Sequence, residues 1–277
     1  DPNEIISVAG KGHEDKQIYK NKIIKSSDKK IIKSLKIKIK KISSREQTFI
    51  QNKKILQIFK KNFKFKNFHG LCIDSRLVKK NNLFVTIKGK NNDGYKFVAD
   101  ALKKGASYII SSRKNKKSQN KFIKVDNEIK FLRYFSSKKR ENSAAEIIAI
   151  TGSAGKTSLK NLTRVLLRNY GETFSSPKSY NNHFGVPLSL SQLNVDHKYG
   201  IFEVGMSKAG EINKLSKLVK PHIGIITNIG EAHIENFNNV KGIAKAKGEL
   251  INHIKKNGTI ILNKDDNYYN YFKKKSK

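Results

Sequence analysis

The sequence predicts an α/β fold in two parts: a small N-terminal α/β domain, followed by a domain in which helices flank a mainly parallel sheet. Three observations favour this fold. Short apolar segments rich in isoleucine and valine alternate with segments whose apolar residues recur at helical spacing. Several of the short segments end in glycine or polar residues, as strands do where they pass into loops. With 277 residues, the chain is also long enough for two domains, each with its own core.

The stretch that organises the larger domain begins with the apolar segment Ile147–Ile150, which predicts a buried strand. A turn with two glycines follows, and then a helix marked by Leu159, Leu162 and Leu166. Strand, glycine turn and helix in this order form a cradle for phosphate, because backbone N–H groups and the helix N-terminus both face an anion. The sequence therefore predicts a nucleotide-binding loop made of Gly152, Ser153, Ala154, Gly155, Lys156, Thr157 and Ser158.

Two side chains of this loop carry its predicted chemistry. Lys156 can neutralise a β- or γ-phosphate, and the Thr157 hydroxyl can bind Mg²⁺. The loop is shorter than the general phosphate-binding pattern, because only two residues separate Gly152 from Gly155. The alternative is a glycine turn that merely joins a strand to a helix. Nucleotide binding is the preferred interpretation, because strand, turn and helix agree.

Residues 1–41 predict a short first unit. Glu4–Ala9 is typical of a strand, and Gly10–Glu14 of a tight loop that is either an ordinary turn or a small polar site. The apolar pattern of residues 31–42 fits a helix face and an alternating strand equally well, so both alternatives stay open.

Residues 44–142 predict a small α/β domain. We expect a helix from Gln47 to Phe59, a helix that starts at Asp93 and ends at Gly105, and strands over 71–73, 83–87, 107–110 and 122–125. The turn Asp74, Ser75 and Arg76 follows the first strand. Asp74 and Arg76 either pair with each other, or Arg76 faces a phosphate or carboxylate.

Residues 146–277 predict the second domain, and its chemistry gathers at strand ends. Glu203 lies near the carboxyl end of the strand Gly200–Val204, where ligands of parallel sheets bind. His233 follows the strand over 222–228 and is either a loop histidine or a metal ligand. Asn263 closes the strand over 259–262.

Lys247 stands out in the helix expected over 239–254, because it falls on the apolar stripe of that helix. Burial lowers the pKa of a lysine, and a neutral amine can react with CO₂ to become an anionic, carbamylated metal ligand. The alternatives are a lysine that snorkels to solvent and one that pairs with Glu203.

Composition bounds the function. The net charge is +36, of which +10 falls in residues 146–277 and +26 in residues 1–145, where lysine is spread through nearly every segment. This distribution favours a solvated, lysine-rich surface; the alternative is a basic nucleic-acid-binding protein on an α/β scaffold. A single cysteine, Cys72, allows no internal disulfide and suits the cytoplasm. No apolar stretch is long enough to span a membrane.

Together these residues resemble the Mur ligases, the ATP-dependent amide-forming enzymes of peptidoglycan synthesis, and most closely their MurF branch. The similar motifs lie in the family's order. They are Asp74–Arg76, Leu83–Val85, Lys88–Gly89, Asp93–Gly94, Gly105–Ala106, Thr151–Thr157, Asn181–Pro187, Glu203–Met206, Asn228–His233, Ala246–Glu249 and Asn263–Asp266. One departure is Ala154, which stands where the family often has asparagine.

The resemblance implies a ligase that adds D-Ala-D-Ala to UDP-MurNAc-tripeptide through an acyl phosphate, with ATP and Mg²⁺. It implies that Lys156 and Asn263 help to hold ATP, that Thr157 and Glu203 bind one Mg²⁺, and that His233 and carbamylated Lys247 bind a second metal. It also implies a substrate-binding role for Asp74, Ser75, Arg76, Asn181 and Asn182. A cytoplasmic, monomeric enzyme without a nucleic-acid partner is expected.

Residues 1–41 resemble instead the C-terminal tail of the MurE branch, through Ala9–Glu14. In that branch, residues matching Gly10 and Glu14 contact meso-diaminopimelate. We therefore expect a MurE–MurF fusion of which this chain is a fragment. The end of the central domain and the whole C-terminal domain are expected to lie outside it, so that the fragment itself is expected to be inactive.

Overall fold

The structure is a computed structural model, and it describes residues 17–19, 22–24, 43–61, 63–66, 68–89, 92–113 and 119–276. The chain divides into two units, residues 1–43 and 44–277. In the first unit, β1 (Gln17–Tyr19) and β2 (Lys22–Ile24) form an antiparallel pair. The expected strand over residues 4–9 and the MurE-like residues Gly10 and Glu14 lie outside the described residues.

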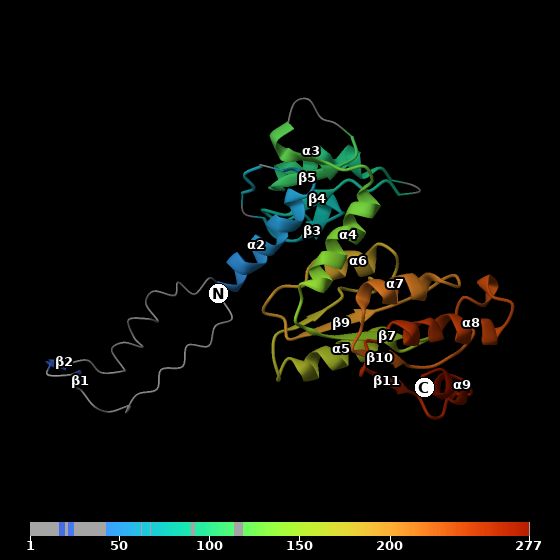
Figure 1. The fold of residues 1–277 in the computed structure, drawn as a ribbon. Helices are drawn as coiled ribbons and strands as arrows, with labels where there is room; N and C mark the ends of the chain where they lie inside the picture. Colours follow the sequence, from blue (N-terminus) through green and yellow to red (C-terminus); the bar gives the residue numbers. More distant parts are fainter. Residues whose placement is uncertain are drawn as a thin grey trace. The chain divides into compact units, whose positions relative to one another are not determined.

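The second unit begins with a four-stranded parallel sheet, in the order β3-β4-β5-β6 (Figure 1). Alternate strand residues face opposite sides, so that two cores form. Leu83 and Ile110 pack against one set of helices, and Phe84 and Ile109 against the other. The elements are α2 (Ser44–Gln57), β3 (Leu71–Cys72), η1 (Ser75–Leu77), β4 (Leu83–Val85), η2 (Gly94–Phe97), α3 (Val98–Lys103), β5 (Tyr108–Ser111), η3 (Gln119–Lys121), β6 (Phe122–Lys124) and α4 (Glu128–Glu141).

A five-stranded parallel sheet follows, in the order β11-β10-β7-β9-β8. Its strands are β7 (Glu146–Thr151), β8 (Thr173–Ser175), β9 (Tyr199–Glu203), β10 (Ile223–Ile226) and β11 (Thr259–Leu262). The chain first builds β8 and β9 on one side of β7 and then β10 and β11 on the other. The carboxyl end of β7 is therefore the point at which the strand order reverses, and a ligand crevice is expected there.

Helices cover both faces of this sheet (Figure 1). Helix α5 packs on the face that carries Ile148, Ile150 and Ile201, and the helices α6, α7 and α8 cover the face of Ile147 and Phe202. The helical elements are α5 (Lys156–Leu167), α6 (Gly185–Leu190), α7 (Glu211–Val219), η4 (Ile234–Asn236), α8 (Val240–Lys247), η5 (Gly248–His253) and α9 (Tyr269–Lys275).

Helix α4 joins the two sheets. Its apolar residues Phe131 and Phe135 pack in the core of the first sheet, and Ser136 donates a hydrogen bond to the carbonyl of Pro187 in α6 at 2.8 Å. At its end, Arg140 donates to the carbonyls of Val219 and Lys220 after α7, both at 2.7 Å. These contacts fix the first sheet against the helical face of the second.

The predicted α/β class is confirmed, and several local expectations change. The helix expected from Asp93 to Gly105 begins as the 3-10 helix η2 and continues as α3, which ends at Lys103. Helix α4 was not predicted, although Asn127 caps it through its side chain and apolar residues follow. Helix α2 begins at Ser44, three residues before the expected start. The helix expected over 239–254 ends at Lys247 and continues as the tighter η5. In α5, Leu162 and Leu166 are exposed, whereas Lys160 is buried.

Candidate functional site

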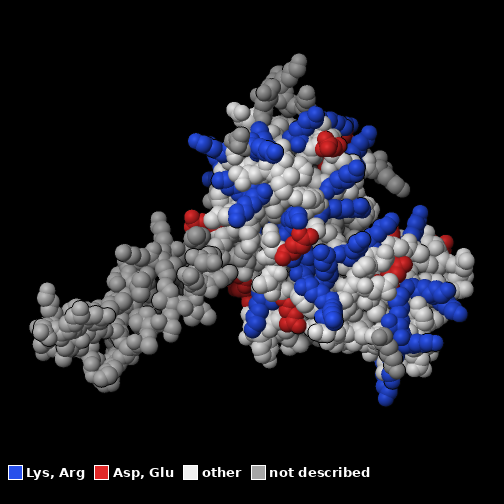
Figure 2. Space-filling view, viewed as in Figure 1, with Lys and Arg blue, Asp and Glu red and all other residues white. Residues whose placement is uncertain are grey.

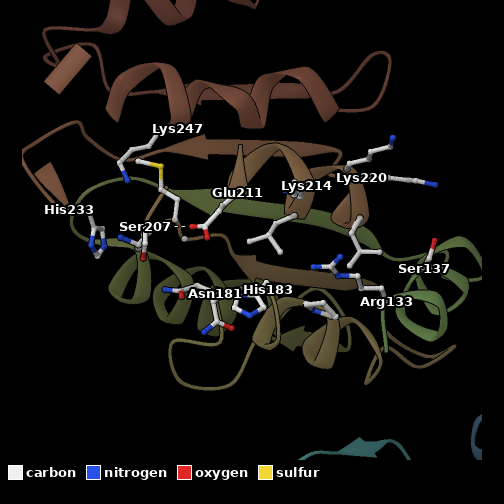
Figure 3. Close-up of a pocket in the computed structure, with 18 of the residues that line it drawn as sticks. Arg133, Ser137, Asn181, His183, Ser207, Glu211, Lys214, Lys220, His233 and Lys247 are labelled. Carbon is white, nitrogen blue, oxygen red and sulfur yellow. Dashed lines mark hydrogen bonds between the residues drawn. The ribbon is translucent and has the colours of Figure 1, made fainter. Parts of the chain in front are cut away.

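A cavity of about 1020 Å³ opens beside the carboxyl end of β7. Its lining comes from the phosphate loop, the 181–183 segment, the 205–207 segment, α4, α7, the segment before α8 and the last residue of α8. Figure 3 shows His233 and Lys247 at one end of this cavity and Arg133 and Lys220 at the other. The cavity therefore connects two groups of charged side chains that are far apart in the sequence.

The phosphate loop is held in shape by the neighbouring strand end. The Ser153 hydroxyl donates to the carbonyl of Gly230 at 3.1 Å and accepts from its N–H at 2.9 Å. The N–H of Ala154 donates to the Asn228 side chain at 2.9 Å. Gly152 has φ of +150°, and a Cβ there would collide with the Thr227 hydroxyl, so that only glycine fits. These contacts order the loop without the asparagine that the family often has at position 154.

Two lysines share one carbonyl in this loop. Lys156 donates to the carbonyl of Gly152 at 2.7 Å, and Lys247 donates to the same oxygen at 2.9 Å. Burial, together with the smaller effect of the positive charge of Lys156, lowers the pKa of Lys247 to about 8. Burial also lowers the pKa of Lys156, against the attraction of Glu203.

The burial of Lys247 on the apolar stripe, predicted from the sequence, is confirmed, since the residue is 2% exposed. Neither alternative for this side chain is observed. It does not reach solvent, and the ion pair with Glu203 is made by Lys160 instead, at 3.5 Å.

Glu203 is the last residue of β9 and is buried at the edge of the phosphate loop. Its Oε2 accepts a hydrogen bond from the Thr157 hydroxyl at 2.8 Å, and its Oε1 accepts one from the Asn181 amide at 2.8 Å. A carboxylate and a hydroxyl side by side suit Mg²⁺, which prefers oxygen ligands and keeps phosphate and water oxygens in its remaining positions. In the described part of the chain, no group of three His, Cys, Asp or Glu side chains could hold a metal ion.

His233 lines the cavity end at which Lys247 lies. Its side chain is about half exposed, its Nδ1 lies 3.8 Å from Oε1 of Glu235, and its backbone adopts the left-handed conformation, with φ of +65°. The structure thus brings His233 and Lys247 to one end of the cavity, and their predicted role as metal ligands stays a prediction.

The two asparagines of the 181–182 pair have different contacts. Asn181 holds Glu203, and its carbonyl accepts from the N–H of Gly205 at 2.8 Å. The Asn182 side chain accepts from the N–H groups of Phe184 and Gly185, and so supports the start of α6. Both asparagines line the cavity, so that a ligand can reach them.

The far end of the cavity is basic, which the sequence did not reveal. Arg133 from α4 and Lys220 from the turn after α7 lie at this end, and two lysines of α7, Lys214 and Lys217, also line the cavity. The only sequence signal for these residues was a helical spacing of cations, which is also typical of a solvated helix face. Because α4 was not predicted, its meeting with α7 was not foreseen.

Other predicted site residues lie outside the cavity lining. Asp74 caps η1 and pairs with the exposed Arg76 at 2.7 Å, so that the first of the two sequence alternatives is observed. The Arg76 guanidinium holds the pKa of Asp74 below its usual range. Ser75 is buried beneath this turn, and Ser158 is exposed in the first turn of α5.

Asn263 is also outside the cavity lining, at the carboxyl end of β11. Its side chain accepts from the N–H of Asp265 at 3.1 Å. In the same turn, Asp266 accepts from the N–H of Ile229 at 2.7 Å. The turn is thus linked to the phosphate loop through the β10 loop, one step away from the cavity.

On the face of the described residues that Figure 2 shows, basic side chains are distributed over both sheets. Figure 2 shows Lys and Arg side chains spread over the visible face of the described residues, with Asp and Glu between them. This distribution matches the lysine-rich surface expected from the sequence and gives no support to the nucleic-acid alternative. Among the described helices, none is long and apolar enough to cross a membrane.

Comparisons with known protein families match most of the chain. The Mur ligase family catalytic domain matches residues 67–153, and the Mur ligase middle domain matches residues 150–277. The chain is 40% identical, over 205 residues or 74% of its length, to a UDP-N-acetylmuramoyl-tripeptide--D-alanyl-D-alanine ligase from Rickettsia prowazekii (strain Madrid E). The match covers 45% of that relative, so that the chain spans about half the length of the curated relatives it resembles.

Solved structures agree with the sequence comparisons. MurF from Acinetobacter baumannii superimposes with a TM-score of 0.73 and 30% identity, over 83% of this chain and 51% of that one. A MurF ligase from Thermotoga maritima, in complex with ADP, superimposes with a TM-score of 0.66 and 29% identity, over 76% of this chain and 49% of that one.

Proposed function

The chain belongs to the Mur ligase family, and from that premise we propose that the whole protein is a ligase that joins D-Ala-D-Ala to UDP-MurNAc-tripeptide at the expense of ATP. One observation carries the proposal for this chain. A single cavity connects Ser153 and Lys156 of the phosphate-binding loop, together with the buried Lys247, to a basic end that suits an acidic acceptor.

In the proposed reaction, a carboxylate of the tripeptide attacks the γ-phosphorus of ATP, the bond to the β-phosphate oxygen breaks, and ADP leaves. The amine of D-Ala-D-Ala then attacks the acyl phosphate and displaces inorganic phosphate, while one proton leaves the nitrogen. Phosphoryl transfer depends mainly on positioning and on neutralising charge. The loop of residues 152–158, which includes Lys156, has the residues for both tasks.

Mg²⁺ fits this site, and Thr157 and Glu203 are the residues that would hold it. When bound, Mg²⁺ neutralises phosphate charge. We further propose that Lys247 becomes carbamylated and, with His233, holds a second metal. Support for this comes from the burial of Lys247 and its pKa of about 8, at which roughly a tenth to a fifth of the amine is neutral near physiological pH, far more than for an ordinary lysine.

The basic end of the cavity is the proposed place of the acceptor. UDP-MurNAc-tripeptide carries a diphosphate and carboxylates, and these anions suit Arg133, Lys214, Lys217 and Lys220. Asn181 and Asn182 lie between the two ends and are proposed to contact the same substrate. Asp74, Ser75 and Arg76 are proposed to contact it outside this cavity, and Asn263 to contact the nucleotide from the β11 turn.

The domain assignment is part of the proposal. Residues 44–142 are the acceptor-binding domain and residues 146–277 the ATP-binding domain, while residues 1–41 are a MurE-like tail. The enzyme is proposed to act as a monomer in the cytoplasm.

The decisive experiment is release of phosphate from ATP by the complete protein, measured with UDP-MurNAc-tripeptide, with D-Ala-D-Ala, and with both. We expect sustained release only with both substrates, together with the pentapeptide product by mass spectrometry. Phosphate release in the absence of UDP-MurNAc-tripeptide and D-Ala-D-Ala, or no phosphate release with both substrates present, would contradict the proposal.

A further inference from the structure

Lys160 is a buried charge to which the proposed reaction gives no role. It lies in α5, one helical turn after Lys156, and is 1% exposed. The neighbouring Leu162 and Leu166 are 57% and 55% exposed. Helix α5 thus turns a lysine inward and two leucines outward, the reverse of what its composition predicts for a helix on a sheet.

The Lys160 ammonium connects two segments at the site. It donates to the backbone carbonyl of Lys178, and its Nζ lies 3.5 Å from Oε2 of Glu203. The same Oε2 accepts from Thr157, while the other oxygen of Glu203 accepts from Asn181. The 178–182 segment therefore touches this ion pair twice, through its Lys178 carbonyl and through its Asn181 amide.

Burying the Lys160–Glu203 ion pair costs free energy, because both charges are removed from water. Both side chains are at most 2% exposed, and two ions removed from water are stable only when hydrogen bonds satisfy them, as they do here. Lys178 has φ of +46°, a backbone conformation that side chains other than glycine rarely adopt. The Lys160 contact holds the carbonyl of this same residue.

We propose that Lys160 is a positioning residue for the Mg²⁺-nucleotide site. Its charge holds Glu203 with one oxygen toward Thr157, and its hydrogen bond to Lys178 fixes the segment from which Asn181 reaches the other oxygen. Only the identity of the ligand, a Mg²⁺-nucleotide bound by Glu203 and Thr157, rests on the proposed function.

The first test needs no ligand and no activity. Hydrogen exchange of the amides over residues 178–186, followed by mass spectrometry, is compared between the wild type and Lys160→Met. We expect exchange in this segment to be at least about tenfold faster in the variant, because the anchor of Lys178 is lost. The matched control is Arg168→Met, which removes an exposed cation from the end of the same helix and should leave the segment unchanged.

The second test measures binding of a non-hydrolysable ATP analogue by calorimetry, once with Mg²⁺ and once with EDTA. We expect Lys160→Met to reduce the Mg²⁺-dependent gain in affinity by about fivefold or more, and to change binding in EDTA by less than about twofold. Lys160→Arg keeps the charge and should restore most of that gain.

Several results would overturn the proposal. The proposal is wrong if Lys160→Met shows the same hydrogen exchange and the same Mg²⁺ dependence as Arg168→Met. It is also wrong if Lys160→Arg folds but behaves like Lys160→Met. Should Lys160→Met not fold, Lys160→Gln keeps a donor for Lys178 without the charge and carries the same Mg²⁺ prediction. A wild type that binds no nucleotide would contradict the proposed function, and the exchange experiment would still decide the role of Lys160.

Discussion

Lys247 and Lys139 are a pair of buried lysines in two regions of the molecule, and they look alike by two measures. Each is 2% exposed, and burial lowers the pKa of each to about 8. Their surroundings differ. Lys247 lines the cavity, donates to the phosphate loop and has Lys156 as its charged neighbour, whereas Lys139 lies in α4, is not part of the cavity lining, and has Asp196 as its charged neighbour.

The comparison of these two lysines shows that a shifted pKa alone does not identify a functional lysine. In Lys139 the attraction of Asp196 offsets part of the cost of burial. In Lys247 the repulsion from Lys156 adds to that cost, and such unrelieved strain is typical of a site built for an anionic ligand. Access to a ligand and the sign of the neighbouring charge separate the two cases.

The largest expected effect is that of Lys156→Ala in the complete protein. Removal of the cation at the phosphates should lower ATP-dependent ligation about 1,000-fold, which corresponds to about 4 kcal/mol of transition-state stabilisation. Thermal unfolding should change little, because Lys156 is half-buried and donates only to carbonyls of its own loop. Phosphate release with both substrates measures the effect. Near-normal turnover would mean that the region around Lys247 is not the active site, and the functional contrast with Lys139 would not hold.

The next effect concerns stability and belongs to Lys139. Below pH 8 this amine is charged in both the folded and the unfolded state, and folding bears the full cost of burying it. Between pH 8 and 10.5 the unfolded state binds more protons, so that this cost falls as the pH rises. Lys139→Met should therefore be more stable than the wild type by about 1–3 kcal/mol at pH 7, and the gain should be much smaller at pH 10.

Urea unfolding of both proteins at the two pH values checks this expectation. Because every other titrating group is common to the two proteins, the difference between them isolates Lys139. A difference that stays constant from pH 7 to pH 10 would mean that the pKa of Lys139 is not lowered in the folded state.

The smallest effect is chemical and separates the two lysines directly. With ¹³C-bicarbonate, a carbamate signal should appear by NMR and should grow with pH, because the neutral fraction of an amine with a pKa of about 8 rises about 25-fold from pH 6.5 to pH 8.5. Lys247→Arg should remove the signal, and Lys139→Met should retain it, because of these two buried lysines only Lys247 lines the cavity. A signal lost in Lys139→Met alone would reverse the assignment.

Sequence patterns predicted the elements whose periodicity is local. The strand over 147–150, the glycine turn after it and the position of Glu203 at a strand end all appear as expected. The burial of Lys247 was predicted because its apolar neighbours recur at helical spacing. In each of these cases the relevant information lies within about one helical turn or one strand.

The contacts that complete the site could not be predicted in the same way. Lys160 looks like a solvated lysine in sequence, and only the fold brings it to Glu203, 43 residues away. Helix α4 was missed because cations interrupt its apolar pattern, and with it the meeting of Arg133 with the lysines of α7. The roles assigned to the motif residues came from resemblance, and they remain predictions.

The clamp that Gly230 and Asn228 place on Ser153 and Ala154 has a thermodynamic consequence. A loop that the strand end already holds loses its conformational entropy when the protein folds, and not when a nucleotide arrives. Nucleotide binding should then keep most of the favourable energy of its phosphate contacts. A mutation at Asn228 would thus weaken binding without removing a contact to the ligand. The loop would be more mobile in the free protein, and nucleotide binding would have to pay the entropy of ordering it.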